Sequence, residues 1–254
     1  MKIWSKKFAA VLASSALALS AFGATNAEAA SKKKDSPKNI IFLIGDGMGN
    51  SYTSAYRYMQ NAPQQQFVKQ TKLDQYLVGQ QMTYPEDPAQ NVTDSASAAT
   101  AMSAGIKTYN NAIAVDNDKQ PVKTVLERAK ELGKATGLVA TSEITHATPA
   151  AFGSHDESRK NMDAIADDYF DELVGKKHKI DVLLGGGKSN FVRQDRDLTK
   201  EFEKAGFHYV TDKKALAKNK EDQLIGLFAD GCLDKMIDRK STTPSLRDMT
   251  TAAL

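Results

Sequence analysis

Apolar runs and amphipathic segments alternate along most of this 254-residue chain. Short apolar runs bounded by polar or glycine-rich segments predict strands over residues 39–44, 78–83, 135–141, 180–184, 208–211 and 223–229. Apolar spacing, capping residues and small residues predict helices within residues 51–60, 92–105, 121–132, 161–173, 198–205 and 213–218, and from residue 243 onward. This alternation predicts an α/β fold, in which a mostly parallel sheet carries helices on both faces.

Two of these helices have a predicted end or a predicted core face. Pro121 suits the first position of a helix that ends at Gly133. In the helix over 51–60, the side chains of Tyr52, Tyr56 and Met59 share one face, which we assign to the core. The last predicted helix is still running at the final residue. We therefore expect residues 39–254 to be the N-terminal part of a larger, truncated α/β domain.

The first 29 residues have the pattern of a signal peptide. Lys2, Lys6 and Lys7 form a positive region, residues 8–23 are apolar, and residues 27–29 form an Ala-x-Ala cleavage signal. A membrane anchor is the alternative, but the apolar run is short for a membrane span. Residues 30–38 then predict a disordered leader. The sequence thus predicts a secreted protein, extracellular or periplasmic, without stable membrane insertion.

Composition excludes some partners. The formal charge is +3, and the lysines and the glutamate of residues 1–29 account for +2 of it, so the remaining chain has no strong basic field for nucleic acid. The single cysteine, Cys232, excludes an intrachain disulfide.

The most informative stretch is residues 92–105, an Ala/Ser-rich helix. Thr93 or Asp94 can cap its start, and Gly105 suits its end. Ser95 in the first turn lies where the positive end of the helix dipole favours anions and a serine alkoxide. Ser95 is therefore a candidate nucleophile. The alternative is a buried helix whose hydroxyl groups only cap it or bond to its backbone.

A second candidate follows the first predicted strand. Asp46 stands in the glycine-rich turn 45–49, at the strand end where open α/β sheets bind ligands. A dinucleotide-binding fingerprint fails because Asn50 stands where its last glycine should be, and a carboxylate would repel pyrophosphate. Asp46 is therefore a candidate metal ligand. The run 185–189 mimics a P-loop, but Val182 stands at its first glycine position, so we expect a tight loop near the sheet edge instead.

A third group follows the strand over 135–141. His146 and Thr148 would face one way in an extended segment and could complete a mixed metal site with Asp46. Arg159 follows and could bind phosphate with two parallel hydrogen bonds. The alternatives are a hydrogen-bonded loop histidine and a solvated charged helix face.

Several segments together resemble the alkaline phosphatase family. They are IFLIGDGMG at 41–49, VTDSASAATA at 92–101, TPAA at 148–151, SRK at 158–160, LIGLFADG at 224–231 and PSLRDM at 244–249. The resemblance runs from residue 39 to the end in the family's order, and Asp94-Ser95-Ala96 in its long context is its most specific part.

The resemblance implies hydrolysis of small phosphomonoesters through a phosphoserine intermediate, with two Zn²⁺ and one Mg²⁺. It implies that Ser95 is the nucleophile, that Arg159 binds the phosphate, and that Asp46 and Thr148 are metal ligands. Family members form dimers, so the resemblance also allows a homodimer.

Two departures from the family pattern change these expectations. Many relatives carry an aspartate where this chain has His146, so Zn²⁺ or Co²⁺ could replace Mg²⁺ there. The family also completes its zinc sites with Asp-x-x-x-His and Asp-His pairs. None of the four histidines here stands four residues after an aspartate or directly after one. We therefore expect the chain to carry the nucleophile but to be inactive alone.

Two other functions stay open. The chain could be a short, non-catalytic secreted protein that binds phosphate or metal. A related sulfatase or phosphodiesterase is a weaker alternative, because the context of Asp94-Ser95-Ala96 disfavours it.

Overall fold

The structure is a computed structural model that describes residues 38–61 and 63–254. The predicted signal peptide and all of the predicted leader except Lys38 lie outside these residues. The chain divides after Gly45 into two units. Within the first, residues 39–45 form neither helix nor strand. Across the described residues, no helix is long and apolar enough to cross a lipid bilayer.

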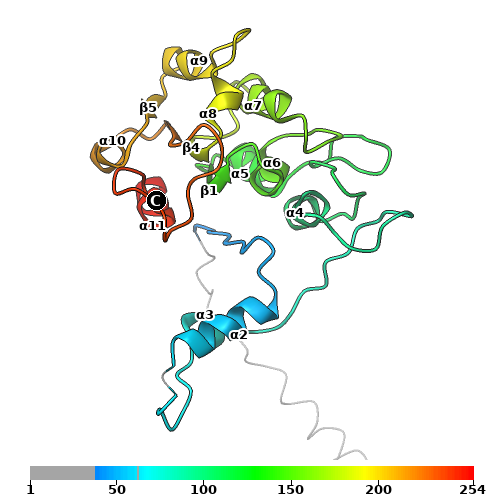
Figure 1. Cartoon of the computed structure of the whole chain (residues 1–254). Helices are drawn as coiled ribbons and strands as arrows, with labels where there is room; N and C mark the ends of the chain where they lie inside the picture. Colours follow the sequence, from blue (N-terminus) through cyan, green and yellow to red (C-terminus); the bar gives the residue numbers. More distant parts are fainter. Residues whose placement is uncertain (1–37, 62) are drawn as a thin grey trace, which may run out of the picture. The chain divides into compact units, whose positions relative to one another are not determined.

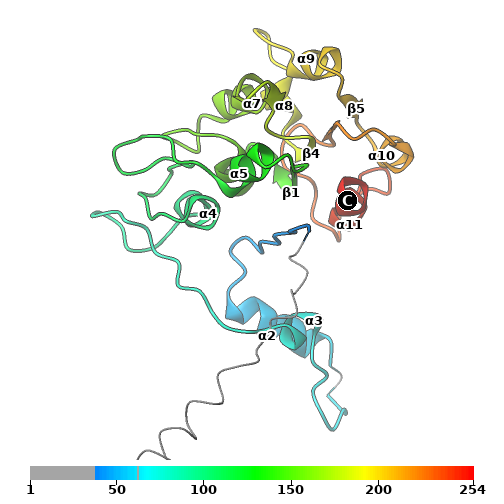
Figure 2. The same cartoon turned by 180° about the vertical axis from the view of Figure 1, so that it is seen from behind.

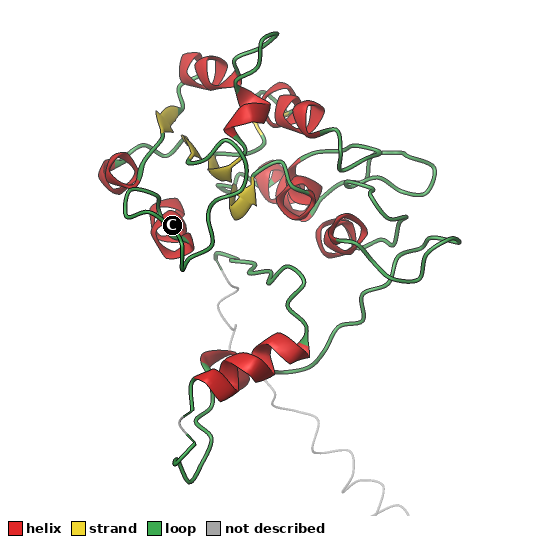
Figure 3. Cartoon of the chain, in the orientation of Figure 1, coloured by secondary structure: helices red, strands yellow, loops and turns green. Residues whose placement is uncertain are grey.

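The second unit contains every described element (Figure 1 and Figure 3). Its strands are β1 (Gly137–Glu143), β2 (Leu173–Val174), β3 (Lys177–His178), β4 (Val182–Gly186), β5 (His208–Val210) and β6 (Leu224–Leu227). Its helices are α2 (Asn50–Met59), α3 (Lys72–Gln75), α4 (Ser95–Ala104), α5 (Val125–Glu131), α6 (Ala147–Gly153), α7 (Met162–Asp171), α8 (Lys188–Phe191), α9 (Leu198–Lys204), α10 (Lys213–Lys218) and α11 (Leu246–Ala253).

Four strands form a parallel sheet in the order β1-β4-β6-β5, which confirms the predicted fold class. Leu138, Leu183 and Ile225 stand opposite one another across β1, β4 and β6 and point to one face. That face packs against α6, α7 and α9 in one buried cluster. Leu184 and Leu224 point to the other face, where α10 and α11 cover them (Figure 1 and Figure 2). Helices therefore cover both faces, as side-chain alternation along buried strands requires.

The predicted strand over residues 39–44 is wrong in this structure. The segment has no strand assignment, and Ile40 and Leu43 are 88% and 78% exposed. An apolar run predicts burial, but a strand also needs a neighbouring strand that forms a hydrogen-bond ladder with it. The strand predicted over residues 78–83 is absent for the same reason.

The predicted core face of the helix over 51–60 is also wrong. The helix itself is confirmed as α2, but Tyr52, Tyr56 and Met59 are all exposed, and α2 buries none of its residues. An amphipathic pattern shows which face would pack if a partner surface is available, but it does not show that one is.

Two boundaries differ from the prediction for local reasons. Pro121 pairs with Val115 in an isolated β-bridge, and α5 starts only after Thr124. Thr124 and Glu127 form a reciprocal capping box, which satisfies two backbone donors and defines a helix start better than a proline does. Gly185 and Gly186 belong to β4, a central strand, so the tight loop expected over 185–189 is confined to Gly187, which turns the chain into α8 with a φ of 89°.

Candidate functional site

Helix α4 places Ser95 at its first position. Asp94 is the N-cap, and its carboxylate accepts a hydrogen bond from the Ser97 backbone N–H at 3.0 Å. Gly105 ends the helix with a φ of 73°, a left-handed conformation that glycine adopts without strain. The predicted cap and end of this helix are therefore confirmed.

The other serines of α4 behave differently from Ser95. Ser103 is buried, and its hydroxyl donates to the Ala151 carbonyl of α6 at 2.6 Å. The Ser97 hydroxyl is buried and bonds to Asp94 and Asn110. Both match the structural alternative, in which hydroxyl groups hold the helix in place. Ser95 instead directs its hydroxyl out of the helix toward another segment.

The Asp46 carboxylate connects Ser95 to Thr148. Ser95 Oγ donates to Asp46 Oδ1 at 3.0 Å, and Thr148 Oγ1 donates to Asp46 Oδ2 at 3.2 Å. Asp46 is an exposed residue. The structure thus brings together three of the five predicted site residues. Ser95 is 49 positions and Thr148 is 102 positions from Asp46 along the chain.

Arg159 lies beside the same helix start. Its Nη1 donates to Asp94 Oδ2 at 3.2 Å, and the two side chains are 20% and 24% exposed. The solvated helix face that was the alternative for Arg159 is therefore not what the structure contains. Because Asp94 immediately precedes Ser95, the guanidinium lies next to the first turn of α4. Asp94 was predicted only as a cap, and its role as the ion-pair partner of Arg159 was missed, since pairing across 65 residues leaves no local signal.

His146 faces Arg159 in this structure. Arg159 Nη2 lies 3.1 Å from His146 Nε2. An arginine can only donate, so Nε2 accepts and the proton of the neutral ring is on Nδ1. Among the described residues, Nδ1 is buried without a hydrogen-bond partner. Burial, followed by the positive charge of Arg159, lowers the pKa of His146 below its ordinary value. The ring is therefore neutral at pH 7.

The local backbone around His146 differs from the prediction. His146 and Thr148 were expected in an extended segment, but the chain turns into α6, with His146 at the N-cap position and Thr148 in the first turn. Pro149 is tolerated there because the first-turn N–H groups of a helix have no partner within the helix. Thr148 therefore reaches Asp46 from a helix start.

The donor set fits a cation only in part. The carboxylate of Asp46 and the hydroxyl of Thr148 are hard oxygen donors of the kind Mg²⁺ prefers. His146 would have to turn its Nε2 away from Arg159 before it could bind a metal. Within residues 38–61 and 63–254, no group of three or more His, Cys, Asp or Glu side chains is arranged to hold a metal ion.

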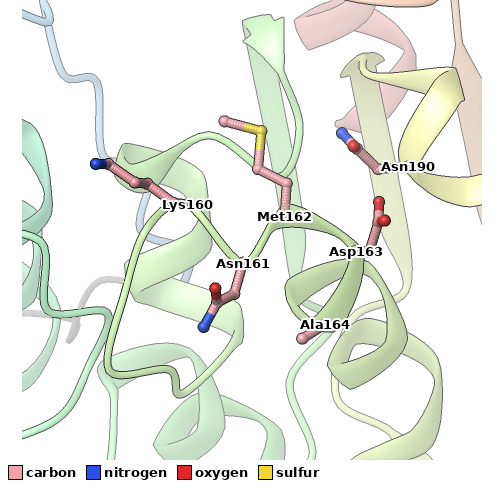
Figure 4. A pocket seen from close by; sticks show the side chains of 6 residues that line it. All are labelled: Lys160, Asn161, Met162, Asp163, Ala164 and Asn190. Atoms are coloured by element: carbon pink, nitrogen blue, oxygen red, sulfur yellow. The ribbon is translucent and has the colours of Figure 1, made fainter.

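A pocket of mixed polar and apolar lining adjoins the segment that follows Arg159 (Figure 4). It is lined by Lys160, Asn161, Met162, Asp163, Ala164 and Asn190. Lys160 directly follows Arg159, and Asn190 donates to the Thr145 hydroxyl at 2.8 Å, one residue before His146. In Figure 4, Lys160 extends away from Asp163 and Asn190. The pocket includes none of the five predicted site residues.

The parallel sheet with helices on both faces makes this an α/β protein. Its serine at a helix start, next to a carboxylate and an arginine, forms a candidate anion-binding site. The alkaline phosphatase family model matches residues 37–254. Alkaline phosphatase 3 of Bacillus subtilis is 65% identical over 260 residues, which cover 100% of this chain and 56% of that protein. The chain belongs to the alkaline phosphatase family.

Solved structures agree with this assignment. A cold-active alkaline phosphatase from a psychrophilic Shewanella superposes with a TM-score of 0.75 at 41% identity, covering 83% of this chain and 50% of that one. An alkaline phosphatase variant from the Antarctic bacterium TAB5, with Mg bound in its M3 site, gives a TM-score of 0.54 at 36% identity, covering 62% and 45%. The chain spans about half the length of the curated relatives it matches.

Proposed function

We propose that this chain takes part in the hydrolysis of phosphomonoesters, with Ser95 as the residue that becomes phosphorylated. Membership of the alkaline phosphatase family supports the reaction class. The observation that carries the proposal is the position of Ser95, at the first residue of α4 with its hydroxyl 3.0 Å from Asp46. A buried helix with a purely structural role would not need its first hydroxyl directed at an exposed carboxylate.

In the proposed reaction, Ser95 Oγ attacks phosphorus while its proton is held at Asp46 Oδ1. The bond between phosphorus and the leaving oxygen breaks, and the leaving oxygen takes a proton from a water molecule. The hydroxide formed from that water then attacks the phosphoserine, the bond from phosphorus to Ser95 Oγ breaks, and Oγ takes back the proton held at Asp46 Oδ1. Arg159 and the positive end of α4 stabilise the phosphoryl oxygens throughout.

Asp46 and Thr148 would hold a divalent cation, and His146 would join them once its Nε2 is released from Arg159. Bound Zn²⁺ or Mg²⁺ would neutralise the negative charge that develops on the attacking and leaving oxygens. The proposal includes two Zn²⁺ and one Mg²⁺, with Zn²⁺ or Co²⁺ in place of Mg²⁺ as the alternative at the His146 site. A catalytic zinc needs about three protein ligands, so we expect turnover to require ligands beyond this group.

The wider setting is part of the same proposal. The substrates are small phosphomonoesters and not nucleic acid, the first 29 residues direct export, and the protein forms a homodimer. N-terminal sequencing of the exported protein should begin at Ala30. Sedimentation analysis would test the dimer.

The decisive experiment traps the phosphoserine. The chain is incubated with Zn²⁺, Mg²⁺ and labelled phosphate, quenched with acid and digested, and the labelled peptide is identified by mass spectrometry. Turnover requires ligands beyond this group, so the experiment tests the first step alone. We expect that step to leave label on Ser95, with loss of the label in Ser95→Ala and retention in the matched control Ser103→Ala from the same helix. Label elsewhere, or label surviving in Ser95→Ala, would refute the nucleophile. Phosphate binding without any label would favour the non-catalytic binding protein.

A further inference from the structure

The buried side chain of Asn110 joins the segments around the start of α4. Asn110 is 6% exposed. Its Oδ1 accepts from the Asp94 backbone N–H and from the Ser97 hydroxyl, both at 2.9 Å. Its Nδ2 donates to Gln90 Oε1 at 2.8 Å and to the Val92 carbonyl at 2.9 Å. The amide therefore uses its donors and its acceptor to fix the chain on both sides of Asp94.

The next residue, Asn111, connects this junction to Arg159. Its backbone N–H donates to Asp94 Oδ2 at 3.0 Å, and its carbonyl accepts from the Arg159 backbone N–H at 2.8 Å. It does so with a φ of 80°, in the left-handed region that asparagine tolerates better than most residues. Two successive residues thus hold both partners of the Arg159–Asp94 ion pair.

We propose that Asn110 is a positioning residue for the phosphate site, because its amide sets the location of Asp94 and, through Asn111, that of Arg159. This inference rests on the proposed function of Ser95 and Arg159. Asn110 contacts neither of those side chains, so it acts only through the residues it holds. A positional error of about 1 Å at a reacting group can cost about a hundredfold in rate.

The test measures Arg159 directly. Hydrogen exchange of the arginine side-chain N–H groups is followed by NMR in the chain, in Asn110→Ala and in Asn110→Asp. We expect Asn110→Ala to speed exchange at Arg159 about tenfold, because the ion pair with Asp94 loosens. Arg193, which is buried against Asp167, is the internal reference and should change less than about twofold. Asn110→Asp keeps the volume and the acceptor oxygen but replaces the donating NH2 by an oxygen that faces Gln90 Oε1 and the Val92 carbonyl, so it should also speed exchange at Arg159.

A matched control and a second measurement make the outcome decisive. Asn219 also makes side-chain hydrogen bonds, to His208 and Glu221, so Asn219→Ala should lower the melting temperature without changing exchange at Arg159. Titration with inorganic phosphate should show binding about tenfold weaker in Asn110→Ala. The inference is overturned if exchange at Arg159 is unchanged in folded Asn110→Ala, or if exchange at Arg193 speeds up by the same factor. If the unaltered chain binds no phosphate, the proposed function fails, while the exchange result still decides the role of Asn110.

Discussion

The guanidinium of Arg159 donates to the carboxylate of Asp94 at 3.2 Å, and Asp94 is also the N-cap of the helix that begins with Ser95. One carboxylate therefore fixes the helix start and the orientation of the arginine. Since the Asp94 oxygens also accept from the backbone N–H groups of Ser97 and Asn111, the carboxylate is held from several directions. The candidate nucleophile and the candidate phosphate-binding residue are thus positioned by the same group.

Replacing Asp94 should separate its two roles. Asp94→Ala removes the helix cap and the ion pair, and we expect the free energy of unfolding to fall by about 1–2 kcal/mol. Asp94→Asn keeps an acceptor for the Ser97 N–H but places an NH2 group against the Asn111 N–H and the Arg159 guanidinium, so it should retain the cap while losing the ion pair and should cost less than Asp94→Ala. Urea denaturation followed by circular dichroism measures both. Asp212→Ala, which removes the N-cap of α10, is the control for a lost cap without a lost ion pair. Equal costs for Asp94→Asn and Asp94→Ala would contradict the division of roles.

Arg159→Lys tests whether phosphate binding uses the planar guanidinium. Lysine keeps the charge but has no fork with which to hold two oxygens at once. We expect the Kd for inorganic phosphate, measured by calorimetry in the presence of Zn²⁺ and Mg²⁺, to rise about tenfold or more. Arg239→Lys, at an arginine that bonds only to backbone carbonyls in the described structure, should leave the affinity unchanged. Full affinity in Arg159→Lys would exclude bidentate binding.

Several residues of the candidate site lie in segments that carry local sequence signals. Asp94 before a run of small residues predicts a capped helix, and the glycine-rich turn marks Asp46. The fold class follows from alternating periodicities, since β4 and β6 are apolar runs and α7 is amphipathic. Each of these signals lies within about ten residues of chain.

What the sequence could not supply depends on contacts between distant segments. Nothing near Arg159 reveals that it pairs with Asp94, and nothing near His146 reveals that its ring faces Arg159. The apolar residues 39–44 satisfy the pattern of a buried strand, yet Ile40 and Leu43 are exposed, because local pattern does not specify the partner. The short hairpin of β2 and β3 escaped prediction because its strands are two residues each.

The backbone of Asn111 gives a third test. At a φ of 80°, a β-branched residue is strained by about 1–3 kcal/mol, whereas glycine is not. We expect Asn111→Val to lower the free energy of unfolding by that amount and Asn111→Gly to leave it within about 1 kcal/mol. Asn161→Val, at a φ of −82°, is the comparison without a left-handed backbone, and any cost there reports the lost hydrogen bond from Asn161 to Asp156. Urea denaturation reports all three, and equal stability of the Val and Gly variants at position 111 would contradict the strain.

Stability at alkaline pH should depend on His155. Burial of this imidazole disfavours its charge, but hydrogen bonds to Glu127 and Glu172 outweigh burial and raise the pKa to about 9. Lys179 and Asp168 also belong to this group of charges. The pKa of His155 in the folded protein lies above its unfolded value of 6.5. The stabilisation that the charged imidazole provides is therefore complete below pH 6.5 and is lost as the pH rises through about 9.

We therefore expect the melting temperature to fall between pH 7 and pH 10, by an amount equivalent to about 2–3 kcal/mol. His155→Gln should be less stable at pH 7 and should lose most of this alkaline decline. His208→Gln, at an exposed histidine, should keep it. Differential scanning calorimetry over this pH range checks the prediction, and an undiminished decline in His155→Gln would assign it to other groups.

Metal preference should change when His146 is replaced by a carboxylate. A neutral imidazole favours Zn²⁺ or Co²⁺, whereas Mg²⁺ prefers oxygen ligands. We expect His146→Asp to increase the ratio of Mg²⁺ to Zn²⁺ retained after equilibrium dialysis, because an added carboxylate near Asp46 and Thr148 supplies a third hard donor. His208→Asp is the control for the added charge alone. Asp46→Asn should reduce retention of both metals, since it removes the negative charge of the carboxylate to which the hydroxyl groups of Ser95 and Thr148 donate. An unchanged metal ratio in His146→Asp would show that residue 146 contributes no ligand and that its ring serves only to orient Arg159.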